Sequence, residues 1–178
     1  VRFIPMLGAK RMQAIAIDLV IDEVPLEGAE AVSPADRIDV KSLDTCDYLV
    51  YPVGAALADK FCALAERHNG RASFRVKDLV DIVVYTLTCD IDGTDLQARL
   101  RREMAVRKIG PIESFAIPQE WANPQARQFA KLCAQTGIPT RLHDIGEASK
   151  LAAKLLDPAL EQRCGGLCWD HESLNWEE

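Results

Sequence analysis

The sequence has no apolar run of about 18 residues, the length that a membrane-spanning helix needs. Its N-terminal stretch lacks a small-residue cleavage site, and three acidic side chains interrupt the apolar residues there: Asp18, Asp22 and Glu23. We therefore expect neither a membrane span nor a signal peptide, and we expect the protein to be cytoplasmic.

Most common site signatures are also missing. The sequence contains no P-loop, no dinucleotide glycine fingerprint, no G-x-S-x-G and no H-E-x-x-H. Its six cysteines are mostly scattered, and Cys164, Cys168 and His171 have a looser spacing than a zinc knuckle. A net charge of −6 argues against broad nonspecific binding of nucleic acid, although it leaves room for a local basic patch. The placement of single charges is therefore the remaining signal.

The composition is that of an ordinary globular protein. The 178 residues are 48% hydrophobic and 27% charged, which suits one domain or two small ones with a real core. Period-two alternation predicts a strand over 14–22, and a short extended piece is expected over 47–53. Helical periodicity and capping signals predict five helices, over 54–67, 73–87, 94–107, 123–137 and 144–156.

Several residues are predicted to bound these helices. Gly70 is expected near the C-terminal cap of the first helix, and Ser73 is a candidate cap of the second. Asp144 and Glu147 have the spacing of a capping box, and Asp157-Pro158 is expected to end that last helix.

Two carboxylates share one face of the predicted strand over 14–22. Asp18 and Asp22 alternate with the apolar residues of the opposite face. Carboxylates on strands often hold Mg²⁺, which prefers oxygen ligands. The alternative is a solvated polar face on an edge strand.

Lys60 borders an apolar stripe on the first predicted helix, which Leu57, Phe61 and Leu64 form at helical spacing. A lysine there can extend its ammonium to water, or it can offer a point charge to a phosphate.

The segment 71–87 should be a largely buried helix, yet it carries Arg75, Lys77, Asp78 and Asp81. Lys77 and Asp81 are spaced as an i, i+4 pair. Asp81 lies between two apolar neighbours, so we expect it to be the least solvated of the four. A charge in apolar surroundings is costly unless it is paired or bound to a ligand. The charges either line a binding site or form a salt-bridge network that joins two helices.

The residues from 51 to 84 closely resemble the core of the AbiEii/AbiGii nucleotidyltransferase-like toxin family. The resemblance extends over roughly 14–178, and its specific part is the K-D-L-V-D segment. The matching positions are Ala58-Asp59-Lys60, Glu66-Arg67, Gly70-Arg71, Ser73, Arg75 and Lys77-Asp78-Leu79-Val80-Asp81.

The resemblance implies an α/β fold, with a partial nucleotidyltransferase sheet over 1–53 and a helical domain over 54–178. It implies a toxin of a toxin–antitoxin or phage-defence system, which transfers a nucleotide from an NTP to an acceptor such as the tRNA 3′ end. The implied partners are the NTP, tRNA and a cognate antitoxin, and the implied cofactor is Mg²⁺.

The resemblance also assigns roles to single residues. Asp18 would help to position Mg²⁺, and Lys60 would bind the nucleotide triphosphate. One of the two carboxylates of Asp78 and Asp81 would support catalysis. Two cations, Arg75 and Lys77, would bind phosphate or hold these carboxylates.

The family's first motif, a Gly-Ser turn with a paired-Asp strand, is not found ahead of Asp18, because residues 1–17 contain no aspartate. Two interpretations follow from this departure. Either the start of the gene is misplaced, or the chain is a truncated, noncatalytic relative that binds nucleotide, antitoxin or RNA.

Overall fold

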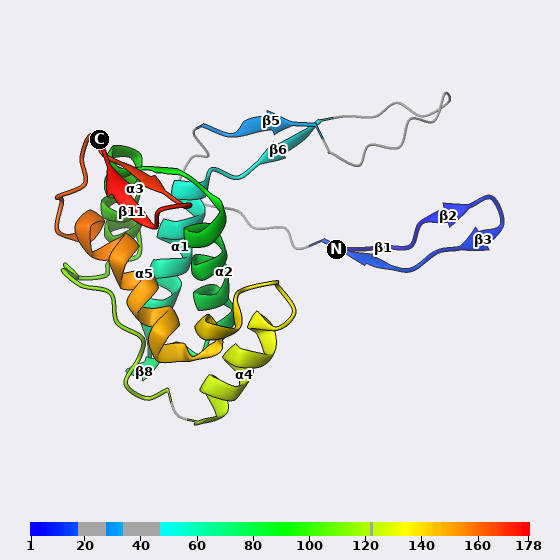
Figure 1. The fold of residues 1–178 in the computed structure, drawn as a ribbon. Coiled ribbons are helices and arrows are strands. Elements are labelled where there is room, and N and C mark those ends of the chain that lie inside the picture. The colour runs from blue at the N-terminus through cyan, green and yellow to red at the C-terminus, as the bar shows by residue number, and fades with distance from the viewer. Residues whose placement is uncertain (18–27, 34–46, 122) are drawn as a thin grey trace.

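The structure is a computed structural model that describes residues 1–17, 28–33, 47–121 and 123–178. It confirms the predicted α/β class, because α-helices are combined with small antiparallel sheets (Figure 1). The helices are α1 (Val53–Ala65), α2 (Val76–Thr88), α3 (Gly93–Val106), α4 (Asn123–Cys133) and α5 (Ile145–Leu160), with a 3-10 turn over Thr140–His143. None of these helices has the length and apolar character that crossing a bilayer requires.

The core lies where α1 packs against α2 and α3, and where α5 covers α2. Most residues of helix α1 are buried, because alanines at 56, 58 and 63 allow its neighbours to approach closely while Leu57 and Phe61 fill the space between helices. Helices α2 and α5 contribute Leu79, Val83 and Leu155 to the same cluster. This packing fixes α1 and α2 side by side.

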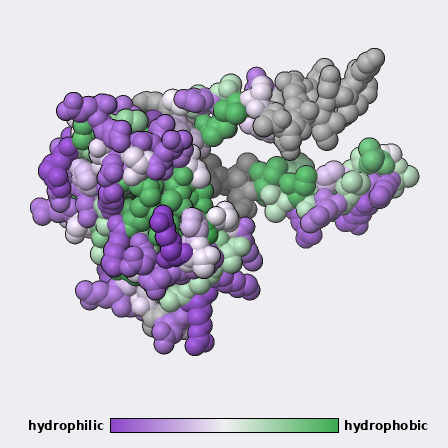
Figure 2. All heavy atoms as spheres, viewed as in Figure 1, coloured by the Kyte–Doolittle hydropathy of each residue, from purple (hydrophilic) through white to green (hydrophobic). Residues whose placement is uncertain are grey.

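The N-terminal strands form two-stranded antiparallel ribbons that extend from one side of the helical body (Figure 1). The pairs are β1 (Arg2–Phe3) with β4 (Ile15–Ala16), β2 (Met6–Leu7) with β3 (Lys10–Arg11), and β5 (Glu30–Val32) with β6 (Tyr48–Val50). Figure 2 shows apolar surface along these ribbons, where side chains such as Leu7 and Leu49 are exposed.

The expected strand over 14–22 is confirmed at Ile15–Ala16, and the extended piece over 47–53 is confirmed at Tyr48–Val50. The residues 18–22 lie outside the described residues. The division into units 1–53 and 54–178 stays a prediction, although α1 begins at its boundary.

Gly70 does not cap α1, contrary to the prediction. Helix α1 ends at Ala65, and the chain turns back in a hairpin of β7 (Arg67–His68) and β8 (Arg71–Ala72). The two turn residues, Asn69 and Gly70, both have positive φ, as the tight Asn-Gly hairpin turn requires. The Asn69-Gly70 pair therefore forms a hairpin turn and does not form the C-terminal cap of a helix.

Two other predicted boundaries are corrected. Ser73 does not cap α2, because its hydroxyl accepts a hydrogen bond from Arg75 N ahead of the helix. Helix α5 continues through Pro158 to Leu160, where burial of the last turn outweighs the lost backbone hydrogen bond. Asp144 caps α5 as predicted, accepting from Gly146 N and Glu147 N.

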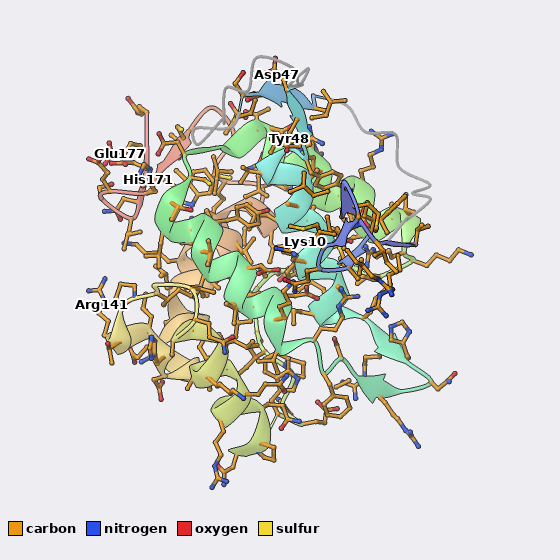
Figure 3. All side chains as sticks on the ribbon, turned by 90° about the vertical axis from the view of Figure 1, so that its right-hand side faces the viewer. Lys10, Asp47, Tyr48, Arg141, His171 and Glu177 are labelled. Atoms are coloured by element: carbon orange, nitrogen blue, oxygen red, sulfur yellow. The ribbon has the colours of Figure 1, made fainter. Side chains whose placement is uncertain are left out.

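The C-terminal segment, which the sequence left unassigned, completes a three-stranded sheet. Strands β10 (Cys168–Asp170) and β11 (Asn175–Glu177) pair with each other, and β10 also pairs with β9 (Ile91–Asp92). Trp169 is fully buried and donates from Nε1 to Thr86 O at 3.0 Å. His171, labelled in Figure 3, lies just after β10 and bonds to Asp90 at 2.6 Å. This sheet attaches the end of the chain to the helical body.

Gly93, at the start of α3, is predicted to tolerate no side chain. A Cβ there would lie 2.1 Å from the carbonyl oxygen of Cys164, which is backbone. We expect Gly93→Ala to lower the free energy of unfolding by about 1–3 kcal/mol. Gly110→Ala is the matched control, because a Cβ there meets nothing within 4 Å. Urea denaturation measures both variants, and equal midpoints for the two would contradict the close approach at Gly93.

Candidate functional site

Charged side chains from α1 and α2 meet at the contact between these two helices. Lys60 Nζ lies 2.7 Å from Asp81 Oδ2 and 3.8 Å from Asp78 Oδ1. Arg75, just ahead of α2, donates from Nε to the other oxygen of Asp78 at 2.5 Å. We call Lys60, Arg75, Asp78 and Asp81 the charged cluster. The i, i+3 spacing of the two aspartates places both on the face of α2 that meets α1.

The charged cluster is shielded from water to different degrees. The exposed fraction of the side chain is 6% for Asp78, 19% for Lys60 and 26% for Asp81. Arg75 is different, because 63% of its side chain is exposed. The cluster therefore has a buried carboxylate at its centre and an arginine that reaches the surface.

The pKa of Lys60 reflects two opposing influences. Burial lowers this pKa, but the hydrogen bond to Asp81 and the charges of both aspartates raise it further, so the net pKa lies above the ordinary 10.5. The titration of Lys60 therefore contributes stability that is fully present below its ordinary pKa of 10.5 and is lost as the pH rises through the raised pKa. Lys60 is a cation throughout the physiological range.

The prediction that Asp81 is the least solvated of the four charged residues was wrong. Asp78 is buried, and Asp81 is only partly buried. Lys60 and Arg75 cover Asp78 from two sides, whereas Asp81 contacts Lys60 alone among the cations of the charged cluster. Apolar neighbours in the sequence do not determine burial on a helix, because they point to other faces.

Two predicted site residues do not join the charged cluster. Lys77 is exposed in the first turn of α2, and its side chain makes no hydrogen bond or ion pair with the described residues, so its expected pairing with Asp81 is not formed. Asp18, the expected magnesium ligand, lies outside the described residues.

Tyr85 is a neighbour of the charged cluster that the sequence reasoning missed. Burial raises the pKa of its phenol, the nearby Lys60 lowers it, and Asp81 raises it again, so that the net shift is upward. The signal was present, because Tyr85 follows Asp81 by four residues and therefore shares its helix face. Tyr85 adds a neutral hydroxyl near the lysine.

A second ion-pair network explains other residues of the motif quoted above. Arg107, at the end of α3, donates to Glu103 at 2.6 Å, bonds to Asp59 and lies 3.5 Å from Glu66. Burial lowers the pKa of Arg107, but these three carboxylates hold it above its ordinary value. Asp59 and Glu66 therefore tie α1 to α3, while the adjacent Lys60 faces α2.

Carboxylate oxygens are the donors that Mg²⁺ prefers, but the two carboxylates of the charged cluster are already paired with lysine and arginine. The described residues alone do not make a magnesium site there. Among them, one group of three candidate ligands gathers, formed by Asp90, Asp170 and His171. These atoms are also engaged, because His171 bonds to Asp90, and Asp170 accepts from the turn that follows. These three side chains therefore hold the turn that follows β10.

Cys164, Cys168 and His171 do not gather as one group of candidate metal ligands. Cys164 is buried and its thiol donates to Gly93 O, while Cys168 donates to a backbone carbonyl. Burial also raises the pKa of the Cys164 thiol, which disfavours the thiolate that a metal would need.

The charged cluster can perform two kinds of task. A lysine held by two carboxylates at the edge of a core can exchange one carboxylate for a phosphate oxygen, since both are anionic acceptors. The same contacts also join α1 to α2 as a salt-bridge network. The geometry alone suits both tasks.

A family model described as "Nucleotidyl transferase AbiEii toxin, Type IV TA system" matches residues 1–161. The match contains the charged cluster, Lys77 and Asp18, and it omits the C-terminal ribbon of β10 and β11. No curated protein and no solved structure matches the chain significantly.

The Lys60–Asp81 contact is predicted to be energetically coupled. In a double-mutant cycle with Lys60→Met and Asp81→Asn, we expect a coupling free energy of about 1 kcal/mol or more, because both groups are largely shielded. The matched control is Lys150 with Glu147, a 2.6 Å pair whose side chains are 75% and 54% exposed. Its coupling should stay below about 0.5 kcal/mol. Equal couplings in urea denaturation would show that the α1–α2 contact contributes no more than a surface pair.

Proposed function

Because this chain belongs to the AbiEii nucleotidyl transferase toxin family, we propose that it transfers a nucleotide from an NTP to an acceptor such as the 3′ end of a tRNA. In this reaction the acceptor's hydroxyl oxygen bonds to the α-phosphorus, and the bond to pyrophosphate breaks with its electron pair. The observation that carries the proposal is the shielded lysine of α1, which contacts two carboxylates of α2 within the matched segment.

Lys60 is proposed to bind the triphosphate. Its ammonium is a compact point charge that stays protonated, and it already holds anionic oxygens at hydrogen-bond distance. A phosphate oxygen would take the place of Asp81, the more exposed of its two partners. This exchange would leave the Asp81 carboxylate available to the reacting groups.

Asp78 and Asp81 are proposed to support catalysis, and they differ in access. Asp78 is buried beneath Lys60 and Arg75, which suits a residue that positions these two cations. Asp81 is more exposed and therefore better placed to accept the proton of the attacking hydroxyl. Arg75 and Lys77 reach the surface ahead of and within the first turn of α2, where they would bind phosphate.

Mg²⁺ is the proposed metal, with Asp18 as a proposed ligand. A divalent ion would neutralise the charge of the triphosphate and of the leaving pyrophosphate. The two carboxylates of the charged cluster are instead held by cations of the chain.

The cognate partner would be an antitoxin protein, since the family comprises toxins of toxin–antitoxin systems. The cytoplasm is the proposed location, because it holds both NTPs and tRNA. Control of such a toxin would act on the charged cluster or on access to it.

A noncatalytic protein that binds nucleotide, antitoxin or RNA is the second candidate. The observation that favours it is that lysine and arginine already neutralise both described carboxylates of the cluster, as in a structural network.

Lys60→Ala is predicted to lower transfer of labelled nucleotide to total tRNA by about 100-fold or more, because the triphosphate loses its cation. Incorporation from each labelled NTP with Mg²⁺ is measured by gel. Lys150→Ala is the matched control, since Lys150 is an exposed lysine that also pairs with a carboxylate.

Transfer that persists unchanged in Lys60→Ala would contradict the proposed role of Lys60. No transfer by the unchanged chain with any NTP, together with retained nucleotide binding in calorimetry, would favour the noncatalytic candidate instead.

A further inference from the structure

A basic stretch lies between α1 and α2. The eleven residues 67–77 carry four arginine or lysine side chains and no acidic residue, in a chain whose net charge is −6. They form the β7–β8 hairpin and the turn that leads into α2. We call the exposed basic and aromatic members of this stretch the basic hairpin surface: Arg67, His68, Arg71, Phe74, Arg75 and Lys77.

Some of these basic side chains have a partner among the described residues, and others have none. Arg67 bonds to Glu120, and Arg75 bonds to Asp78. The side chains of Arg71 and Lys77, in contrast, make no hydrogen bond or ion pair with the residues that the structure describes. Acidic side chains accompany two other members of the stretch, because Glu120 bonds to Arg67 and Glu66 lies 3.6 Å from His68. Arg71 and Lys77 are therefore the cations that remain available to phosphate groups.

An exposed aromatic ring lies among these cations. Phe74 is 60% exposed, whereas Val106, the other exposed large apolar side chain in the described part of 53–178, is 40% exposed. The position of Phe74 is fixed by its neighbours. Ser73 O accepts from Trp121 Nε1 at 2.7 Å, and the Ser73 hydroxyl accepts from Arg75 N. The ring is therefore presented on a hydrogen-bonded turn.

The surface is hollowed beside this ring. A hollow of about 600 Å³ is lined by residues 68, 69 and 71–75, so that it is bounded by the hairpin, Phe74 and Arg75. Arg75 also bonds to Asp78, which places the hollow next to the charged cluster. A strand that occupied the hollow would thus contact Arg75, the residue that the hollow shares with the charged cluster.

We propose that the basic hairpin surface binds a single-stranded segment of RNA, with phosphates on Arg71 and Lys77 and an unstacked base on the ring of Phe74. Aromatic stacking on a base needs a single strand, because a duplex keeps its bases within the stack. This inference rests on the proposed function in one respect, since the strand is the acceptor that the charged cluster would modify.

Binding of a fluorescein-labelled 12-nucleotide single-stranded RNA, followed by anisotropy without any NTP, tests this inference. We expect Phe74→Ala to weaken binding about tenfold and Phe74→Trp to retain it, because a stacking contact needs only an aromatic face. Arg71→Ala should lower the slope of log affinity against log salt by about 0.7, the value for one lost phosphate contact on a single strand.

Arg101→Ala is the matched control, because Arg101 is an exposed arginine of α3 that lines none of these surfaces. The inference is overturned if Phe74→Ala and Arg71→Ala bind like this control, or if duplex RNA of the same length binds more tightly. Absence of binding by the unchanged chain at about 100 μM, the weak end of nonspecific affinity, also overturns it.

The two proposals fail in different ways. RNA binding that depends on Phe74 and Arg71, without any nucleotide transfer, refutes the proposed catalysis and supports the hairpin surface. Nucleotide transfer that requires Lys60 but is indifferent to both hairpin substitutions supports the catalysis and refutes the hairpin surface.

Discussion

One ionic contact joins the two central helices, α1 and α2, which apolar packing places side by side. Lys60 of α1 donates to Asp81 and lies near Asp78, both on α2, at a place where most of the surrounding surface is apolar. A single charge buried in such a position is energetically costly, whereas a pair of opposite charges is tolerated. The packing of α1 on α2 therefore brings the charges together, and their pairing in turn stabilises that packing. A phosphate-binding task would use the same property, because an ammonium with replaceable anionic partners can accept a substrate without a new burial cost.

The charged residues of the family-like motif form two ion-pair networks, and each network joins α1 to a different helix. Asp59 and Glu66 contact Arg107 and join α1 to α3, while Lys60 contacts the aspartates of α2. Adjacent residues of one helix thus face two different neighbours, as the 100° step of an α-helix dictates. The small side chains of α1 make this arrangement feasible, because alanines allow both neighbouring helices to approach within reach of the charges.

The sequence was informative where signals were local and misleading where they required tertiary contacts. Helical periodicity identified all five described helices, and the resemblance to the toxin family was confirmed over 1–161. The Asn69-Gly70 turn was misread, because a glycine after a helix resembles both a cap and a hairpin. Pro158 was expected to end α5, but the burial of Leu160 extends the helix. Asp78 is more buried than Asp81 because both Lys60 and Arg75 contact it. These cations come from α1 and from the turn ahead of α2, so the local sequence of α2 did not reveal the difference.

Arg75 belongs to two environments at once, since its guanidinium bonds to Asp78 and its side chain also borders the hollow at the hairpin. Any occupant that drew this guanidinium outward would leave Asp78 to Lys60 alone, and would thereby tighten the hold on the lysine. By thermodynamic linkage the effect is reciprocal, so that a ligand competing for Lys60 would in turn alter how firmly Arg75 is retained. The arginine is therefore a short physical connection through which the two surfaces can communicate without movement of either helix.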